Sequence, residues 1–276
     1  MEEKISKEEL QKAGKIIDKL NQYYNSKVVG QPFLGAALLV AMITNGHILL
    51  ESVPGLAKTT AANVMTDAVS GQFSRRQCTP DLIPSDIIGT QTYKLPEVFV
   101  VIATQNPVEQ EGTYVLSEAQ MDRFLLKVKL DYPKPVDEIE ILNRIEADVF
   151  SESHAVAALE DVQFLQELSK RVYMDDAIKQ YIVDIVQASR NTDKLLKPEL
   201  AQYVTMGAST RAAISFMEVA KAVALMNGRS YCIPDDVKAM RYAVLRHRVM
   251  LNFAAVADGI KEETIIDGII GAVKAP

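Results

Sequence analysis

The sequence has no tryptophan and only two cysteines among its 276 residues. Cys78 and Cys232 stand far apart and form no Cys-x-x-Cys pair, which excludes the common zinc and thiol-redox motifs and fits a reducing compartment. The histidines are dispersed as well, without the spacing of metal ligands: His47, His154 and His247. We therefore interpret the cysteines as small apolar residues and His47 as a packed residue at the start of a strand.

Long apolar runs and an excess of positive charge are also absent. The sequence contains no run of 18 apolar residues, and its charged beginning, MEEKISKEEL, has no apolar signal segment behind it, so we expect a cytoplasmic protein. The net charge is −6, which predicts no nucleic-acid binding and no direct attachment to anionic membranes. What remains is the composition of a globular protein, long enough for one large domain or two ordinary ones.

The first 132 residues alternate between helix-like and strand-like segments. Helices are predicted over residues 6–24, 30–45 and 58–69 and from Ser117 in LSEAQMDRF, where Gln120 completes a capping box. Strands are predicted for four apolar or alternating runs: HILLES (47–52), QFSRRQCT (72–79), VFVVIATQ (98–105) and LLKVKLDY (125–132). Together these segments predict an α/β domain over residues 1–132.

Beyond residue 132 the pattern becomes helical. One face of AIKQYIVDIVQASR carries five apolar residues: Ile178, Tyr181, Ile182, Ile185 and Val186. In PDDVKAMRYAVL, a proline suits the first turn and four residues share a face: Val237, Met240, Val244 and Leu245. We therefore predict an all-helical domain over residues 133–276. RHR (246–248) is interpreted as a solvated last turn, with the binding of acid groups as the alternative.

The stretch ESVPGLAKTT (51–60) lies between a predicted strand and a predicted helix, the setting of a phosphate-binding loop. The usual pattern is G-x-x-x-x-G-K-[ST], and here Ser52 and Ala57 replace the two glycines before Lys58 and Thr59. A helix N-terminus attracts anions, Lys58 would neutralise the β- and γ-phosphates, and the Thr59 hydroxyl would ligate Mg²⁺. The alternative is an ordinary turn with a surface lysine.

The two replaced glycines are expected to differ in backbone cost. Ala57 costs little if its φ is negative, whereas Ser52 would be strained by roughly 1 kcal/mol if its position needs a positive φ. The predicted nucleotide-binding residues are Ser52, Val53, Pro54, Gly55, Leu56, Ala57, Lys58, Thr59 and Thr60.

Four blocks of the sequence together resemble the MoxR family of AAA+ ATPases: ESVPGLAKT (51–59), TPDLIPSDIIGT (79–90), VIATQNPVEQEGTYVLSEAQMDRFLLKV (101–128) and GASTRA (207–212). In this family the last loop glycine is typically alanine, as at Ala57, while Ser52 departs from the usual glycine. The resemblance implies a P-loop core with a parallel sheet flanked by helices, followed by an all-helical lid. It also implies ATP and Mg²⁺ as cofactors.

By the same resemblance, Asn106 is sensor 1 and positions the attacking water, Arg123 is the finger that reaches a neighbouring subunit's nucleotide, and Arg211 is sensor 2, which ties lid to core. Plainer interpretations remain for two of them: Asn106 as part of an Asn-Pro turn, and Arg123 as a partner of Asp122 or of the helix dipole. Arg211 would follow a capping Ser209 into the first turn of a helix, where a cation opposes the dipole and a bound nucleotide would account for it.

The resemblance further implies MgATP bound between the subunits of a ring, a hexamer, with hydrolysis moving the lid against the core to remodel a protein client. Proteins with a von Willebrand factor A domain are common partners in the family, and a membrane would be reached only through partners. Two other classes are considered: a non-hydrolysing nucleotide-dependent scaffold, and a DNA-directed AAA+ motor, which the acidic balance disfavours.

One expected part is missing, an apolar strand ending in Asp-Glu that would fix Mg²⁺ and activate water. The acidic loop NPVEQEG (106–112) does not replace it, since no apolar pocket is evident to raise the pKa of Glu109 or Glu111. The resemblance places the absent elements, on the order of fifty residues, at the junction of Tyr93 and Lys94. Either the natural polypeptide carries a further segment here, or the protein lacks it and cannot hydrolyse ATP. An intact mass of 30.5 kDa supports the second explanation, and a mass several kDa larger supports the first.

Overall fold

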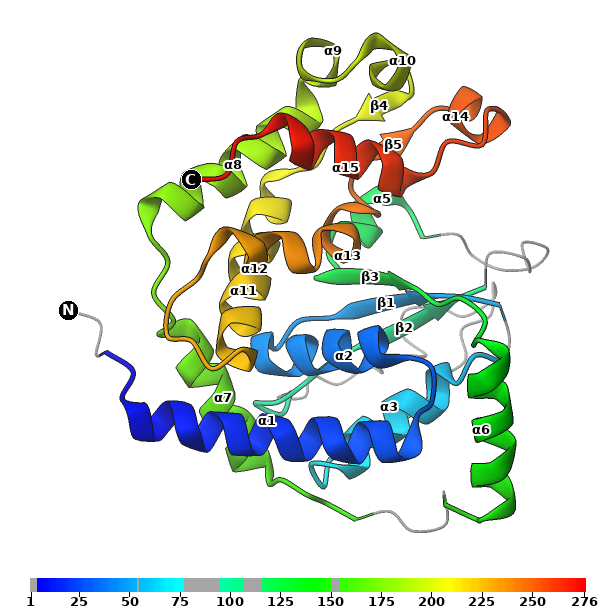
Figure 1. Ribbon diagram of the computed structural model, residues 1–276, viewed down its shortest axis with the longest axis vertical. Coiled ribbons are helices and arrows are strands. Elements are labelled where there is room, and N and C mark those ends of the chain that lie inside the picture. Colours follow the sequence, from blue (N-terminus) through cyan, green and yellow to red (C-terminus); the bar gives the residue numbers. More distant parts are fainter. Residues whose placement is uncertain (1–3, 54, 77–94, 107–115, 150–153) are drawn as a thin grey trace.

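Residues 4–53, 55–76, 95–106, 116–149 and 154–276 are described by a computed structural model of the protein (Figure 1). Its main sheet has three parallel strands in the order β2-β1-β3: β1 (Ile48–Glu51), β2 (Ile102–Gln105) and β3 (Leu126–Lys129). The first residue of β1 pairs with the first residues of both neighbours, and the last with the last. The three strands therefore share one amino edge and one carboxyl edge, and the carboxyl edge is where α/β proteins bind ligands.

The helices of the first half form where local sequence signals place them: α1 (Lys7–Lys27), α2 (Pro32–Thr44), α3 (Lys58–Asp67) and α5 (Glu118–Met121). The start of α5 has the predicted capping box, in which the Gln120 side chain accepts a hydrogen bond from the Ser117 N–H at 2.9 Å. The end of α2 is an Asn45 in the left-handed conformation, at φ 53°. The strand predicted over 72–79 is not observed over residues 72–76, and its remaining residues lie outside the described ranges.

The second half of the chain is mainly helical, as predicted. Its helices are α6 (Pro135–Glu146), α7 (Leu159–Lys170), α8 (Asp176–Arg190), α9 (Thr192–Leu195), α10 (Pro198–Ala201), α11 (Thr210–Met226), α12 (Pro234–Ala239), α13 (Arg241–Leu245), α14 (Phe253–Ala257) and α15 (Glu262–Ala272). The five-residue stripe of α8 is buried. The predicted helix over PDDVKAMRYAVL is broken at Met240, which separates α12 from α13. Two short antiparallel strands add a small sheet: β4 (Val204–Met206) and β5 (Met250–Leu251).

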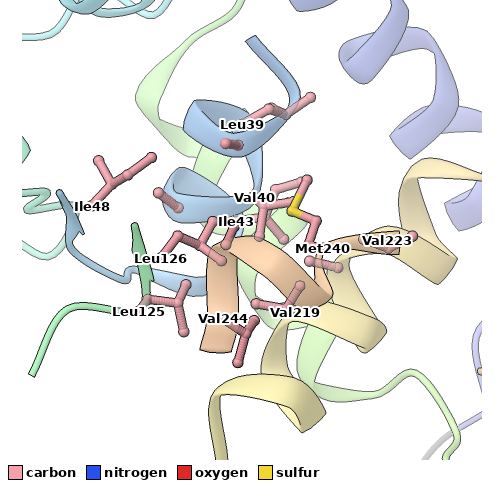
Figure 2. Close-up of a cluster of buried hydrophobic side chains, with 14 of the residues drawn as sticks. Leu39, Val40, Ile43, Ile48, Leu125, Leu126, Val219, Val223, Met240 and Val244 are labelled. Carbon is pink, nitrogen blue, oxygen red and sulfur yellow. The ribbon is translucent and has the colours of Figure 1, made fainter. Parts of the chain in front are cut away.

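The two halves of the chain share one hydrophobic cluster. Figure 2 shows Val40 and Ile43 of α2 and Leu126 of β3 close to Met240 and to Val244 of α13. The division at residue 132 stays a prediction, but the apolar contact across it is continuous. None of the helices in the described ranges has the length and apolarity needed to cross a lipid bilayer.

Candidate functional site

The loop after β1 lies at the carboxyl edge of the sheet, between the central strand and α3. The Ser52 N–H donates to the Gln105 carbonyl at 3.2 Å, which holds the start of the loop against the end of β2. The Lys58 ammonium donates to the Ser52 carbonyl at 2.8 Å and so points back into the loop, and Thr59 is exposed in the first turn of α3. The sequence-predicted strand, loop and helix are all present in this order.

The start of α3 is open to an anion. Its N-cap residue, Ala57, has no side chain that could cap the helix, and the first turn contains no acidic residue. By contrast, α1 is capped by Ser6, and Glu9 completes its capping box. Because the first N–H groups of a helix need acceptors, an N-terminus without side-chain acceptors is suited to a phosphate group.

The backbone of the loop shows which of the two replaced glycines stands at a left-handed position. Ala57 has φ 53° and ψ 19°, in the left-handed region, whereas the φ of Ser52 is not positive. Ser52 is 4% exposed and its hydroxyl donates to the Val53 carbonyl at 2.9 Å. Neither condition stated from the sequence is met, since the φ of Ala57 is positive and that of Ser52 is not, so the left-handed residue stands at the second glycine position.

Replacing Ala57 by glycine is expected to stabilise the protein. The left-handed conformation costs alanine roughly 1 kcal/mol and costs glycine almost nothing, so Ala57→Gly should raise the free energy of unfolding by a similar amount. The matched control is Ala61→Gly in the same helix, which should lower it, since glycine is unfavourable in a helix interior. Thermal unfolding without nucleotide measures both, and a lower melting temperature for Ala57→Gly would contradict the assignment of strain.

Asn106 follows directly after β2 and therefore lies at the same carboxyl edge as the loop. Its neighbour Gln105 pairs with Glu51 and accepts from Ser52, so the Asn106 backbone is adjacent to the start of the loop. The sequence-predicted grouping of Lys58, Thr59 and Asn106 is thus present at one edge. Glu109, Glu111 and the junction of Tyr93 and Lys94 lie outside the described residues.

The predicted arginines lie at the opposite, amino edge of the sheet. The segment between α5 and β3 reaches the sheet where the Leu125 N–H donates to the His47 carbonyl at 2.8 Å, just before β1 begins. The strands between the two edges span roughly 10 Å at the usual rise of 3.3 Å per residue. Arg123 is exposed on this segment, and among the described residues its guanidinium has no ion pair or hydrogen-bond acceptor. The alternative in which Arg123 pairs with Asp122 is not observed.

Asp122 is instead the meeting point of three side chains from the second half of the chain. It accepts hydrogen bonds from Ser209 Oγ at 2.9 Å, Arg248 Nε at 2.9 Å and Arg211 Nη1 at 3.2 Å. Burial raises the pKa of Asp122, but these hydrogen bonds outweigh it and hold that pKa below its usual range. Ser209 is the N-cap of α11, as predicted. Arg211 lies in the first turn of this helix, and Asp122 supplies the negative charge beside it.

The placement of Arg211 differs from the expectation for a residue that senses its own subunit's nucleotide. Arg211 is held beside Asp122 at the amino edge, next to Arg123, and not at the carboxyl edge with Lys58. It does tie the helical half to the sheet half, as predicted for this residue, and its side chain is 55% exposed. The structure thus forms two groups of predicted site residues, one at each edge.

The interpretation of RHR (246–248) as a solvated turn was wrong. The side chain of Arg246 is 9% exposed and pairs with Glu263, and His247 and Arg248 are buried. The sequence contained a signal for this. Arg248 continues the apolar face of α12 and α13 at helical spacing, four residues after Val244, and its guanidinium meets acceptors that no local pattern could identify.

His247 makes the unfolding free energy depend on pH. Its Nε2 lies 3.0 Å from the Phe124 carbonyl, an acceptor that requires the proton on Nε2, and Nδ1 has no partner among the described residues. Burial, aided by the charge of Arg248, lowers the pKa of His247 to about 3. Because the unfolded chain binds this proton near pH 6.5 and the folded protein does not, stability is full above that pH and falls below it.

We expect this effect to remove about 2 kcal/mol of stability between pH 6.5 and pH 5. His247→Gln keeps a donor for the Phe124 carbonyl but cannot be protonated, so its unfolding free energy should be flatter over this window. Urea unfolding at several pH values measures the difference. Parallel pH curves for the two proteins would contradict a neutral buried His247.

Comparison with known proteins agrees with this geometry. The profile described as "ATPase family associated with various cellular activities (AAA)" matches residues 47–94 and 88–126, and the profile described as "AAA lid domain" matches residues 199–269. The chain is 35% identical to Chaperone MoxR1 of Mycobacterium tuberculosis, over 90% of this chain and 79% of that protein. It is 34% identical to the uncharacterized protein YeaC of Bacillus subtilis, over 95% of each chain.

A solved structure has the same fold. The crystal structure of a candidate ATPase from Cytophaga hutchinsonii superposes with a TM-score of 0.90 at 34% identity, over 98% of this chain and 97% of that one. Within the described residues no cluster of three or more histidine, cysteine, aspartate or glutamate side chains could hold a metal ion.

The comparisons also bear on the missing segment. The match to the Mycobacterium tuberculosis protein runs over 300 aligned positions but spans 90% of 276 residues, about 248, so about fifty positions have no counterpart in this chain. The first profile is matched in two pieces, which overlap over residues 88–94 of this chain. The place of the absent segment, at the junction of Tyr93 and Lys94, stays a prediction.

Proposed function

The chain belongs to the MoxR family of AAA+ ATPases, and we propose that it binds MgATP between neighbouring subunits of a ring and uses hydrolysis to remodel a protein client. The observation that carries the proposal is the loop at the carboxyl edge, where an uncapped α3 and an inward-pointing Lys58 meet the end of β2. A site of this kind is built for the phosphates of a nucleotide.

Each residue at the carboxyl edge has a separate task. Lys58 neutralises charge on the β- and γ-phosphates, and the N–H groups at the start of α3 hold phosphate oxygens. The exposed Thr59 hydroxyl would hold Mg²⁺, which when bound neutralises charge on the phosphate oxygens. Asn106, one residue beyond β2, orients the water that attacks the γ-phosphate.

The residues at the amino edge serve a neighbour. Arg123 and Arg211 lie across the sheet from the Lys58 of their own subunit, so a head-to-tail arrangement would bring them to the next subunit's nucleotide. A ring results when such contacts close, and we propose the hexamer of the family. A von Willebrand factor A-domain protein is the proposed partner, again by family analogy.

Movement within one subunit is disfavoured. The helical half and the sheet share a continuous hydrophobic cluster (Figure 2), so sliding the lid over its own sheet would break close packing. We therefore propose that hydrolysis changes the angle between subunits, in place of the lid-against-core movement that the family resemblance implies.

The second candidate is a scaffold that binds nucleotide without hydrolysing it, favoured by the missing Asp-Glu strand. One experiment separates the two. The natural polypeptide is purified and its intact mass is measured. It is then assayed for nucleotide binding and for phosphate release with MgATP. We expect binding together with release. Binding without release, at an intact mass of 30.5 kDa, would establish the scaffold, and an empty loop at millimolar ATP would refute both candidates.

A further inference from the structure

We propose that Arg248 is a positioning residue for Arg123, and that it fixes the exposed arginine in the orientation needed at the neighbouring subunit's nucleotide. This inference rests on the proposed trans role of Arg123. It assigns a task to a buried arginine that touches neither the nucleotide nor the phosphate loop. Arg248 follows α13 and is 4% exposed.

The contacts of Arg248 surround Arg123 on both sides. Its Nη2 donates to the Asp122 carbonyl at 3.1 Å and to the Phe124 carbonyl at 2.7 Å, and its Nη1 donates to the Leu125 carbonyl at 3.3 Å. Its Nε donates to the Asp122 carboxylate at 2.9 Å. One guanidinium therefore holds the residue before Arg123 and the two residues after it.

We call these contacts of Arg248 with residues 122, 124 and 125 the clamp. Other contacts of Arg248 fix it in the helical half. Arg248 also donates to the Val244 carbonyl at 2.6 Å and to Ser215 Oγ of α11 at 3.0 Å. The neighbouring His247 adds a further hydrogen bond to the Phe124 carbonyl at 3.0 Å. Because α11 and α13 belong to the shared hydrophobic cluster, the segment that carries Arg123 is attached to the core of the subunit.

Only an arginine can make this set of contacts. Its five N–H groups lie in a rigid plane and reach acceptors in several directions, whereas lysine offers three donors from one nitrogen. Holding a catalytic group in its productive geometry before the reaction removes an entropic cost, and a displacement of about 1 Å can slow a reaction about 100-fold. Arg123 has no ion pair of its own among the described residues, so its backbone is what the structure holds.

The test compares Arg248→Lys with Arg229→Lys. Both replace an arginine that forms hydrogen bonds to an aspartate, but Arg229 pairs with Asp236 inside the helical half and does not contact the segment of Arg123. We expect Arg248→Lys to lower kcat for ATP by about 10- to 100-fold with KM unchanged, because its own phosphate loop is intact. Arg229→Lys should lower the melting temperature and leave kcat unchanged.

Mixing experiments separate a trans defect from a structural one. Arg248→Lys subunits mixed with Lys58→Ala subunits, which keep an intact Arg123, should regain activity, as Arg123→Ala subunits should in the same mixture. Loss of kcat without recovery in the mixture, or an unchanged kcat, would overturn the proposal. If Arg248→Lys fails to fold, Asp122→Asn is the second variant. We expect it to show the same loss of kcat and the same recovery in the mixture, because the Asp122 carboxylate accepts a hydrogen bond from Arg248.

A measurement that does not depend on ATP hydrolysis keeps this inference separate from the proposed function. Amide hydrogen exchange over residues 122–126 should be faster in Arg248→Lys than in the unmodified protein, and unchanged in Arg229→Lys. An unmodified protein that releases no phosphate would refute hydrolysis, and the exchange rates would still decide whether Arg248 holds the segment. Equal exchange rates in all three proteins would overturn the clamp.

Discussion

Replacing Lys58 by alanine is expected to abolish ATP turnover and to weaken ATP binding by about 10- to 100-fold. The lysine supplies charged hydrogen bonds to the phosphates, each contributing about 1.5–3 kcal/mol in a typical protein. The N–H groups at the start of α3 remain in the variant, so some affinity should persist while the charge on the γ-phosphate is no longer neutralised. Phosphate release and calorimetric titration with ATP measure the two effects.

The fold should survive this substitution. Lys58 donates a hydrogen bond to the Ser52 carbonyl, and the loss of such a bond costs about 1 kcal/mol. The control is Lys179→Ala, which removes a 53% exposed lysine from α8 and should leave binding and turnover unchanged. Turnover that persists in Lys58→Ala would show that the loop after β1 is not the site of hydrolysis.

Local sequence signals predicted those parts of the fold that depend on neighbouring residues. The capping box of Ser117 and Gln120, the buried stripe of α8 and the capped start of α11 all follow from spacing along one helix. The sheet and the phosphate loop follow from an apolar strand before a loop and a helix. Such signals are readable because the interacting groups lie within a few residues of one another.

The features that the sequence did not predict depend on distant contacts. The left-handed Ala57 results from how the loop closes, and neither its own side chain nor a neighbour's shows it. The burial of Arg248 requires a partner for its charge. That partner, Asp122, is distant in the sequence, and more than half of the helical region lies between the two residues. Strands β4 and β5 are too short to carry a periodic pattern.

The position of Arg211 shows the same limit in the functional site. Its place in the first turn of α11 was readable, and the need for a negative partner followed from the helix dipole. The sequence could not say whether that partner is a phosphate or a carboxylate. In the structure it is Asp122, at the edge of the sheet away from Lys58, which places Arg211 with Arg123.

Replacing Arg123 by alanine is expected to lower kcat by about 10³-fold or more, with little change in ATP affinity or in melting temperature. An arginine that enters a neighbouring active site stabilises charge that develops in the transition state and contributes little to ground-state binding. Arg123 is exposed, so its removal leaves no cavity. A steady-state ATPase assay gives kcat and KM, and a rise in KM with kcat unchanged would contradict a finger role.

Mixing this variant with Lys58→Ala decides whether the arginine acts on a neighbour. In a randomly assembled ring of equal parts, about one quarter of the interfaces join an intact phosphate loop from an Arg123→Ala subunit to an intact arginine from a Lys58→Ala subunit. Two inactive proteins should therefore regain about one quarter of the normal rate. If Arg123 served its own subunit, no mixed ring would contain a complete site, and the mixture would stay inactive. Arg211→Ala should show the same recovery, because Arg211 lies at the same edge as Arg123.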